Sequence, residues 1–103
     1  MSGANPHRGE ANLDVAGERL LLRPTFTALV AAEEELGSLF EFVERAAEGA
    51  LKLQQIAALF DHLTRERPTS ITRERIGEAV VEKGLIGITP ALKLVLTQIL
   101  QGR

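Results

Sequence analysis

The sequence predicts an α+β fold in which an N-terminal β-hairpin packs on a small bundle of about five α-helices. Two short segments with alternating apolar residues flank a glycine-containing turn, whereas the rest of the chain places apolar residues at helical spacing. Composition agrees, because 103 residues with 45% apolar and 25% charged content are typical of one globular domain. We expect that domain over residues 12–103, after a mobile N-terminal arm over 1–11.

The hairpin is expected over residues 12–23. Apolar residues alternate with polar ones on both strands, and Gly17 supplies the positive φ that a short turn requires. A two-stranded hairpin is marginally stable alone, so its apolar face is expected to lie on helices. Leu21 falls on the opposite face, and Pro24 ends the second strand. The expected core face consists of Leu13, Val15, Leu20 and Leu22.

Local start and stop signals define five helices. Serine or threonine precedes four of them as an N-cap candidate, and the last of these is followed by Pro90 at the first helical position. Gly37 and Gly84 follow the first and fourth helices, where glycine commonly ends a helix. The N-cap candidates are Thr25, Ser38, Thr72 and Thr89. The expected ranges are about 25–36, 38–48, 52–65, 72–83 and 89–101.

The first expected helix carries an acid among its apolar residues. Its apolar face consists of Phe26, Leu29, Val30 and Leu36, and Phe26 is expected to pack on the hairpin. Glu33 falls inside the same arc, so its carboxylate must reach water or meet a cation. A structural ion pair from Glu33 to Arg19 or Arg23 is favoured over a partner-binding or catalytic acid.

No arrangement of residues indicates catalysis, a cofactor or a metal site. The chain has no cysteine, which excludes disulfides, thiolate ligands and cysteine nucleophiles and fits a reducing compartment. His7 and His62 each lack a second ligand at short spacing, and residues 84–87 lack the phosphate-loop pattern. No apolar run reaches the length of a membrane span and no signal peptide is evident, so a cytoplasmic protein is expected.

Charge is unevenly distributed along the chain. Residues 1–51 carry nine acids and four bases, whereas residues 52–103 carry five acids and eight bases, for a formal net charge of −2. This asymmetry is expected mainly to match two halves that pack together, and alternatively to steer a partner.

Four arginines gather at one helix–helix junction, in the segment TRERPTSITRER. A DNA-binding helix-turn-helix is one interpretation of this segment. The interleaved glutamates and the acidic net charge instead favour a solvated loop with local ion pairs, so nucleic acid is not the expected partner. The arginines are Arg65, Arg67, Arg73 and Arg75.

Several apolar residues lie off the faces that are expected to enter the core. Leu94 points away from its apolar neighbours in the last helix, and Leu21 does the same on the hairpin. Phe40 and Phe42 lie at the two edges of the apolar stripe of the second helix. Such residues are often ordinary surface exceptions, but together in one patch they mark a partner-binding site.

Three stretches resemble the gene transfer agent tail assembly chaperone-like family of phage-type tail proteins: RGEANLDVAGERLLLRPTF, ALVAAEEELG and ITRERIGEAVVEKGL. The resemblance covers nearly the whole chain, and its most specific element is LRPTF followed by Glu33 and the Leu36-Gly37 helix end. It implies a small accessory protein that binds the helical tape-measure protein and keeps it soluble while tail-tube subunits polymerise. The same family label has also been attached to the tail tube itself.

A non-enzymatic tail assembly chaperone-like protein is therefore the leading functional hypothesis. Its expected partners are phage-type tail proteins, a tape-measure-type protein first and a tail-tube subunit second. Off-stripe leucines and many charges of both signs fit a protein that holds an apolar helix in solution without a cofactor. The expected partner-binding residues are Leu21, Phe40, Phe42 and Leu94. The alternatives are a structural tail component and, less favoured, a small DNA-binding regulator.

Overall fold

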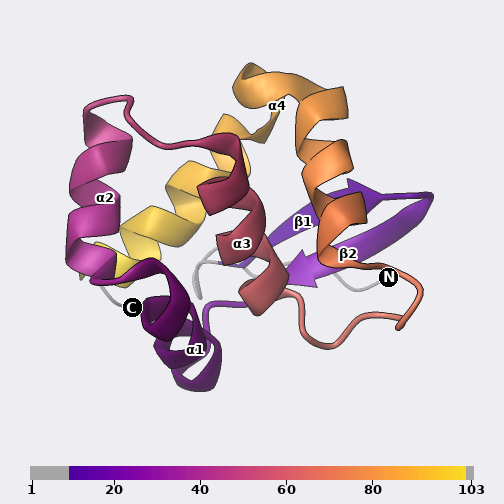
Figure 1. Cartoon of the computed structure of the whole chain (residues 1–103), viewed down its shortest axis with the longest axis horizontal. Coiled ribbons are helices and arrows are strands. Elements are labelled where there is room, and N and C mark those ends of the chain that lie inside the picture. The colour runs from indigo at the N-terminus through magenta and orange to yellow at the C-terminus, as the bar shows by residue number, and fades with distance from the viewer. Residues whose placement is uncertain (1–9, 102–103) are drawn as a thin grey trace.

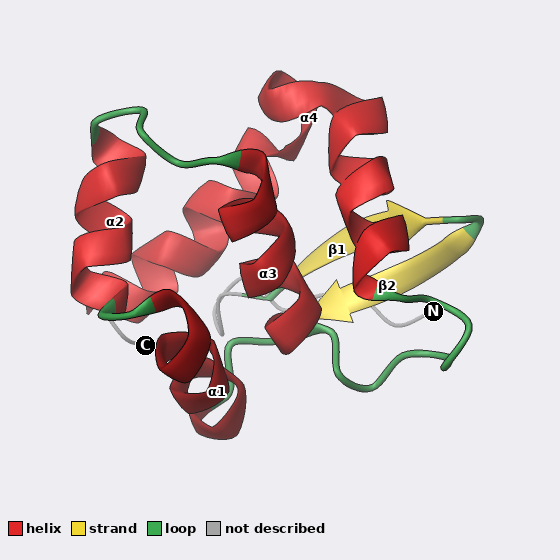
Figure 2. Ribbon diagram, in the orientation of Figure 1, coloured by secondary structure: helices red, strands yellow, loops and turns green. Residues whose placement is uncertain are grey.

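The computed structural model describes residues 10–101, in which two strands precede four helices (Figure 1, Figure 2). The elements are β1 (Ala11–Val15), β2 (Glu18–Leu22), α1 (Phe26–Leu36), α2 (Leu39–Ala47), α3 (Leu53–Leu63) and α4 (Arg73–Gln101). The predicted α+β class is confirmed, with four helices in place of about five. Most of the expected mobile arm lies outside the described residues, and Ala11 at its end belongs to β1.

The hairpin joins its strands by a two-residue turn. Ala16 has a φ of 51° and Gly17 a φ of 83°, which is the pair of positive values that a tight hairpin turn with right-handed strand twist requires. The antiparallel register pairs Leu13 with Leu20, so both side chains point to the same face of the sheet. As predicted, this face is buried, and it consists of Leu13, Val15, Leu20 and Leu22.

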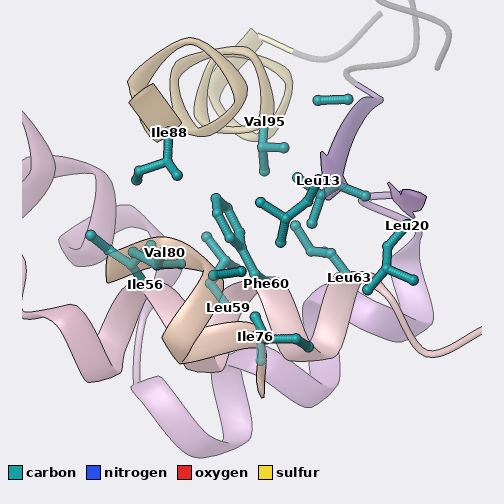
Figure 3. Packing of buried hydrophobic residues seen from close by; sticks show 14 of the residues in the cluster. Leu13, Leu20, Ile56, Leu59, Phe60, Leu63, Ile76, Val80, Ile88 and Val95 are labelled. Atoms are coloured by element: carbon teal, nitrogen blue, oxygen red, sulfur yellow. The ribbon is translucent and has the colours of Figure 1, made fainter. Parts of the chain in front are cut away.

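Helix α3 lies at the centre of the molecule and packs against α1, α4 and β2. Every residue from 56 to 63 is buried, as expected for a helix that has neighbours on all sides. Figure 3 shows Phe60 of this helix among Leu13 of β1 and Ile88 and Val95 of α4. The core is therefore assembled around α3, with the hairpin and both parts of α4 closing over it.

Helix α1 buries a different face from the one predicted. Its buried residues are Ala28 and Ala32, whereas the side chain of Phe26 is 82% exposed and that of Val30 is 38% exposed. The prediction that Phe26 packs on the hairpin is therefore wrong. The reason is that α1 packs on α3, and alanines allow two helix backbones to approach closely. At about 100° per residue, Phe26 and Val30 then project from the opposite side of α1.

Helix α4 is bent at Gly84, whose φ of 81° and ψ of 158° are not helical. The bend separates a first arm, residues 73–83, from a second arm, residues 85–101. The second arm folds back behind α3 toward α2 (yellow in Figure 1). Gly84 therefore turns the chain as predicted, but without the predicted gap of several residues before the next helix.

The N-cap predicted at Thr89 is wrong, because this residue lies inside the second arm of α4. Its hydroxyl donates a hydrogen bond to the carbonyl of Leu85, 2.6 Å away, as a threonine inside a helix commonly does. Pro90 likewise lies within the helix rather than at its first position. Since proline has no N–H, the carbonyl of Ile86 loses its helical partner, at a residue whose side chain is 92% exposed.

We expect the substitution Gly84→Ala to lower the free energy of unfolding by about 1–3 kcal/mol, because its backbone conformation is one that residues with a Cβ rarely adopt. Gly87→Ala is the matched control. An added Cβ there would lie 3.4 Å from the Cβ of Lys83, in ordinary contact, and would remove a helical glycine. That control is expected to leave stability unchanged or raise it by up to about 1 kcal/mol. Urea denaturation measures both, and equal effects of the two substitutions would contradict the assigned bend.

Candidate functional site

Apolar side chains are exposed together where α1, α2 and the end of α4 meet. The exposed fractions are 82% for Phe26, 65% for Phe40 and 54% for Leu100. They surround a hollow of about 360 Å³, which we call the α1–α2 hollow. The hollow is lined by Phe26, Leu29, Val30, Glu33, Leu39, Phe40, Val43, Ile99 and Leu100. Eight of these nine residues are apolar, so this surface can bind an apolar partner without desolvating many polar groups.

A second apolar depression, of about 540 Å³, runs between α2 and the second arm of α4. We call it the α2–α4 groove. Its lining residues are Val43, Ala46, Ala47, Gly49, Leu51, Ile56, Leu85, Ile88, Thr89, Leu92, Lys93, Leu96, Thr97 and Leu100. Val43 and Leu100 line both depressions, so the hollow and the groove form one continuous apolar surface.

Capping interactions fix the two helices that carry the hollow. The backbone N–H of Ala28 donates to the hydroxyl of Thr25 at 3.2 Å, and that of Glu41 donates to Ser38 at 3.3 Å. Both predicted N-caps are therefore confirmed. Gly37, with a φ of 85°, makes the turn between the helices. The exposed aromatic residues thus lie on helices whose starting points are set by local hydrogen bonds.

Glu33 takes part in this turn in a way that the sequence did not predict. Its carboxylate accepts a hydrogen bond from the backbone N–H of Leu39, 3.1 Å away, at the start of α2. Arg19 instead pairs with Asp14, and Arg23 pairs with Glu10 and Glu66. The predicted ion pair from Glu33 to Arg19 or Arg23 is therefore replaced by a helix cap, because the α1–α2 turn places the carboxylate beside a free N–H.

The structure separates the four residues that were expected to bind a partner. Phe40 lies in the apolar surface, whereas Phe42 is fully buried and is excluded from it. Leu94 is half-buried against the core, and Leu21 lines a different hollow beside the hairpin. The expected patch of all four residues therefore does not form.

Sequence reasoning missed Phe26, Val30 and Leu100 as surface residues. For Phe26 and Val30 the available signal was the alanine pair in α1, since a small-residue face that contacts a helix leaves the larger residues outside.

Asp61, near the C-terminal end of α3, is the centre of a polar network. Its carboxylate is almost fully buried, with 8% of the side chain exposed, and it accepts hydrogen bonds from Arg73 at 2.9 Å and 3.1 Å. Arg67 forms an ion pair with the same carboxylate and donates to the backbone carbonyls of Asp61 and Ile71. Burial raises the pKa of Asp61, but the two guanidinium groups outweigh burial and lower it overall.

His62 extends this network to α1. Its Nε2 lies 2.8 Å from a carboxylate oxygen of Glu35, and its Nδ1 lies 2.8 Å from a guanidinium nitrogen of Arg65. Because arginine can only donate, Nδ1 is the acceptor in its contact with Arg65, and Nε2 is the nitrogen that donates to Glu35. The same Glu35 carboxylate accepts from Arg73 at 2.7 Å.

These contacts correct the interpretation of the arginine-rich segment. Arg65, Arg67 and Arg73 each contact a side chain of α1 or α3, whereas Arg75 is exposed and makes no such contact with any residue between 10 and 101. The loop between α3 and α4 is largely exposed, as predicted, but the ion pairs of Arg67 and Arg73 are not local to it and connect α1, α3 and α4. A DNA interface built on these four arginines is disfavoured, because three guanidinium groups would have to leave their carboxylate, histidine or carbonyl partners.

Acidification is expected to destabilise the protein through Glu35. Hydrogen bonds from Arg73, and then from His62, lower the pKa of Glu35 from 4.5 to about 2. The unfolded chain therefore binds this proton first, so the stabilising contribution is complete above about pH 5 and is lost as the pH falls toward 2. Urea denaturation across this range should show Glu35→Gln with a lower plateau and a shallower acid decline than the parent. Parallel curves for the two proteins would contradict this role.

Within residues 10–101, no group of three histidine, aspartate or glutamate side chains is placed to hold a metal ion. His7 lies outside that range. Over the same residues, no helix combines the length and the hydropathy needed to cross a bilayer.

The fold and its exposed surface define the class of the protein. Contiguous apolar side chains around two hollows, on a small helical domain, are typical of proteins that bind other proteins. The family model described as "Phage tail tube protein, GTA-gp10" matches residues 8–102, and the chain belongs to this family. The resemblance to tail proteins of gene transfer agents and phages is thereby confirmed. Searches of the curated proteins and of the solved structures find no match.

Proposed function

We propose that this tail protein acts as an assembly factor that binds an apolar helix of a second tail protein, of the tape-measure type, and keeps it soluble before assembly. The observation that carries the proposal is the continuous apolar surface of α1, α2 and α4. Phe26, Phe40 and Leu100 lie on it with more than half of each side chain exposed. Exposed apolar area of this kind is retained where a partner covers it.

The arrangement of the surface favours a helical partner. The α2–α4 groove lies between two helices, and a third helix packs naturally into such a groove through its own row of side chains. A tape-measure protein supplies long apolar helices before the tail tube encloses it. The proposed role needs contact area and solubilising charge, and it requires no bond to be made or broken.

Retention of a tape-measure-type protein from the same gene cluster tests this proposal. The double substitution Phe26→Ser and Phe40→Ser is expected to weaken binding by more than about tenfold, because two aromatic anchors are removed. The control Val81→Ser changes an apolar residue that is 64% exposed on the first arm of α4, and it should bind like the parent. Both variants are expected to fold, since neither changes a buried residue. Undiminished retention by the double variant would count against the proposed surface.

A structural component of the finished tail is the second candidate, and the family description favours it. Tube proteins build rings from extended sheets, whereas residues 10–101 contain two strands of five residues each. Mass spectrometry of purified particles separates the two candidates. An assembly factor should be absent from finished particles, and a tube component should be present in many copies.

A further inference from the structure

The apolar surface is bordered by carboxylates that have no cation partner within residues 10–101. Residues 26–48, which comprise α1, α2 and the C-cap of α2, carry six glutamates and a single base, Arg45. Among the six, Glu35 is held by Arg73 and His62. The remaining five form no ion pair with a described residue: they are Glu33, Glu34, Glu41, Glu44 and Glu48. Ion pairs within the described residues therefore neutralise only part of the excess of acidic residues in the N-terminal half of the sequence.

Two of these carboxylates lie along the α2 edge of the α2–α4 groove. Glu44 and Glu48 are one turn apart and exposed, next to the groove-lining residues Val43, Ala47 and Gly49. The opposite edge is the second arm of α4, on which Lys93 is the one charged residue between 85 and 101. The groove thus has an acidic edge on α2 and a nearly uncharged edge, with one lysine, on α4.

We propose that the α2–α4 groove receives an amphipathic helix with a cationic edge, whose lysines or arginines lie along α2 facing Glu44 and Glu48. This inference rests on the proposed function and adds the chemistry of the partner segment. An apolar face fills the groove, and the charges set the rotation and direction of the bound helix. Helix α2 has nine residues and a length of about 14 Å, so about two and a half turns of a partner helix span its length.

Two stapled helical peptides of about 14 residues test the inference with the full chain. They share the same leucine positions and differ in one edge, which carries lysines in one peptide and glutamates in the other. The lysine peptide is expected to bind about fivefold to twentyfold more tightly at low salt, as two or three partly exposed ion pairs allow. The difference should shrink toward unity at 0.5 M salt, where exposed charges are screened.

Matched charge reversals locate the effect. Glu44→Lys with Glu48→Lys should abolish the preference for the lysine peptide or reverse it. Glu78→Lys with Glu82→Lys makes the same change of charge one turn apart on the first arm of α4, and it should change the affinity ratio by less than about twofold. Fluorescence anisotropy measures all the affinities, and circular dichroism confirms that each variant is folded.

The remaining outcomes overturn the inference in distinguishable ways. Equal affinity for both peptides would show that the groove binds helices regardless of the charge on their edge. That result would contradict the inference but not the proposed function. Binding of neither peptide would remove the groove as a helix site, and retention of the tape-measure-type protein then decides the proposed function separately. A concentration-dependent dimer in sedimentation, dispersed by Leu92→Glu in the groove, would assign the groove to a second copy of the chain.

Discussion

Replacing Phe60 with alanine is expected to lower the free energy of unfolding by about 3–5 kcal/mol. Phe60 is fully buried on α3, the helix around which the hairpin and both arms of α4 pack (Figure 3). Alanine would leave a cavity where the ring lies among residues of β1 and α4, and these cannot all collapse into it. Small domains are stable by about 5–15 kcal/mol in total, so the variant should be close to unfolding at 37 °C. Urea denaturation monitored by circular dichroism gives the value.

Phe26→Ala is the matched control, because it removes the same side chain from a position that is 82% exposed. Its expected effect on stability is within about 0.5 kcal/mol. The two phenylalanines thus separate folding from binding. Comparable losses of stability for both variants would mean that Phe26 also packs into the core, and the apolar surface would then lose its main aromatic residue.

Removing the carboxylate of Asp61 is expected to have the second-largest effect. In Asp61→Ala, Arg67 loses its ion pair and Arg73 loses one of its two carboxylate partners. Breaking a buried ion pair from one side costs about 3–5 kcal/mol, because the remaining charge stays buried without compensation. Arg73 is 40% exposed and is partly rescued by water and by Glu35, so we expect about 2–4 kcal/mol.

Asp14→Ala provides the comparison for Asp61→Ala. Asp14 pairs with Arg19 at 3.2 Å on the hairpin, but the two side chains are 52% and 67% exposed. An exposed pair contributes about 0–1 kcal/mol, since water screens both charges. Thermal unfolding of the two variants at neutral pH makes the comparison. Equal shifts in Tm would show that the network around Asp61 adds nothing beyond a surface ion pair.

Local signals in the sequence were sufficient for the hairpin and the helix starts. Alternation and a glycine turn predicted which strand residues are buried, and serine or threonine before an apolar run predicted the caps at Thr25, Ser38 and Thr72. The helix-start signal predicted wrongly at Thr89 and Pro90, because this threonine and proline lie inside a helix. Whether Thr89 starts a helix or lies inside one depends on the bend at Gly84, which brings the second arm into contact with α2 and α3. Rules based on neighbouring residues in the sequence cannot predict that tertiary contact.

The candidate site could not be predicted from the helical spacing of apolar residues, because it depends on which helices contact each other. Helical periodicity placed Phe26, Leu29 and Val30 on one face, and the usual assumption is that the larger apolar residues are buried. The neighbour of α1 proved to be α3, against which the two alanines pack. Glu35, His62 and Arg73 likewise come together from three helices, so the network that they form has no signature in sequence order.

The alanine face of α1 has a consequence for how this protein can diversify. Because Ala28 and Ala32 alone of α1 are buried, the large outward residues of the helix contribute little to folding. Phe26 and Val30 can therefore be substituted to suit a changed binding partner, while the packing of α1 in the fold stays the same. Variants with new recognition preferences should be obtainable by randomising these positions alone, with melting temperatures that stay near that of the parent.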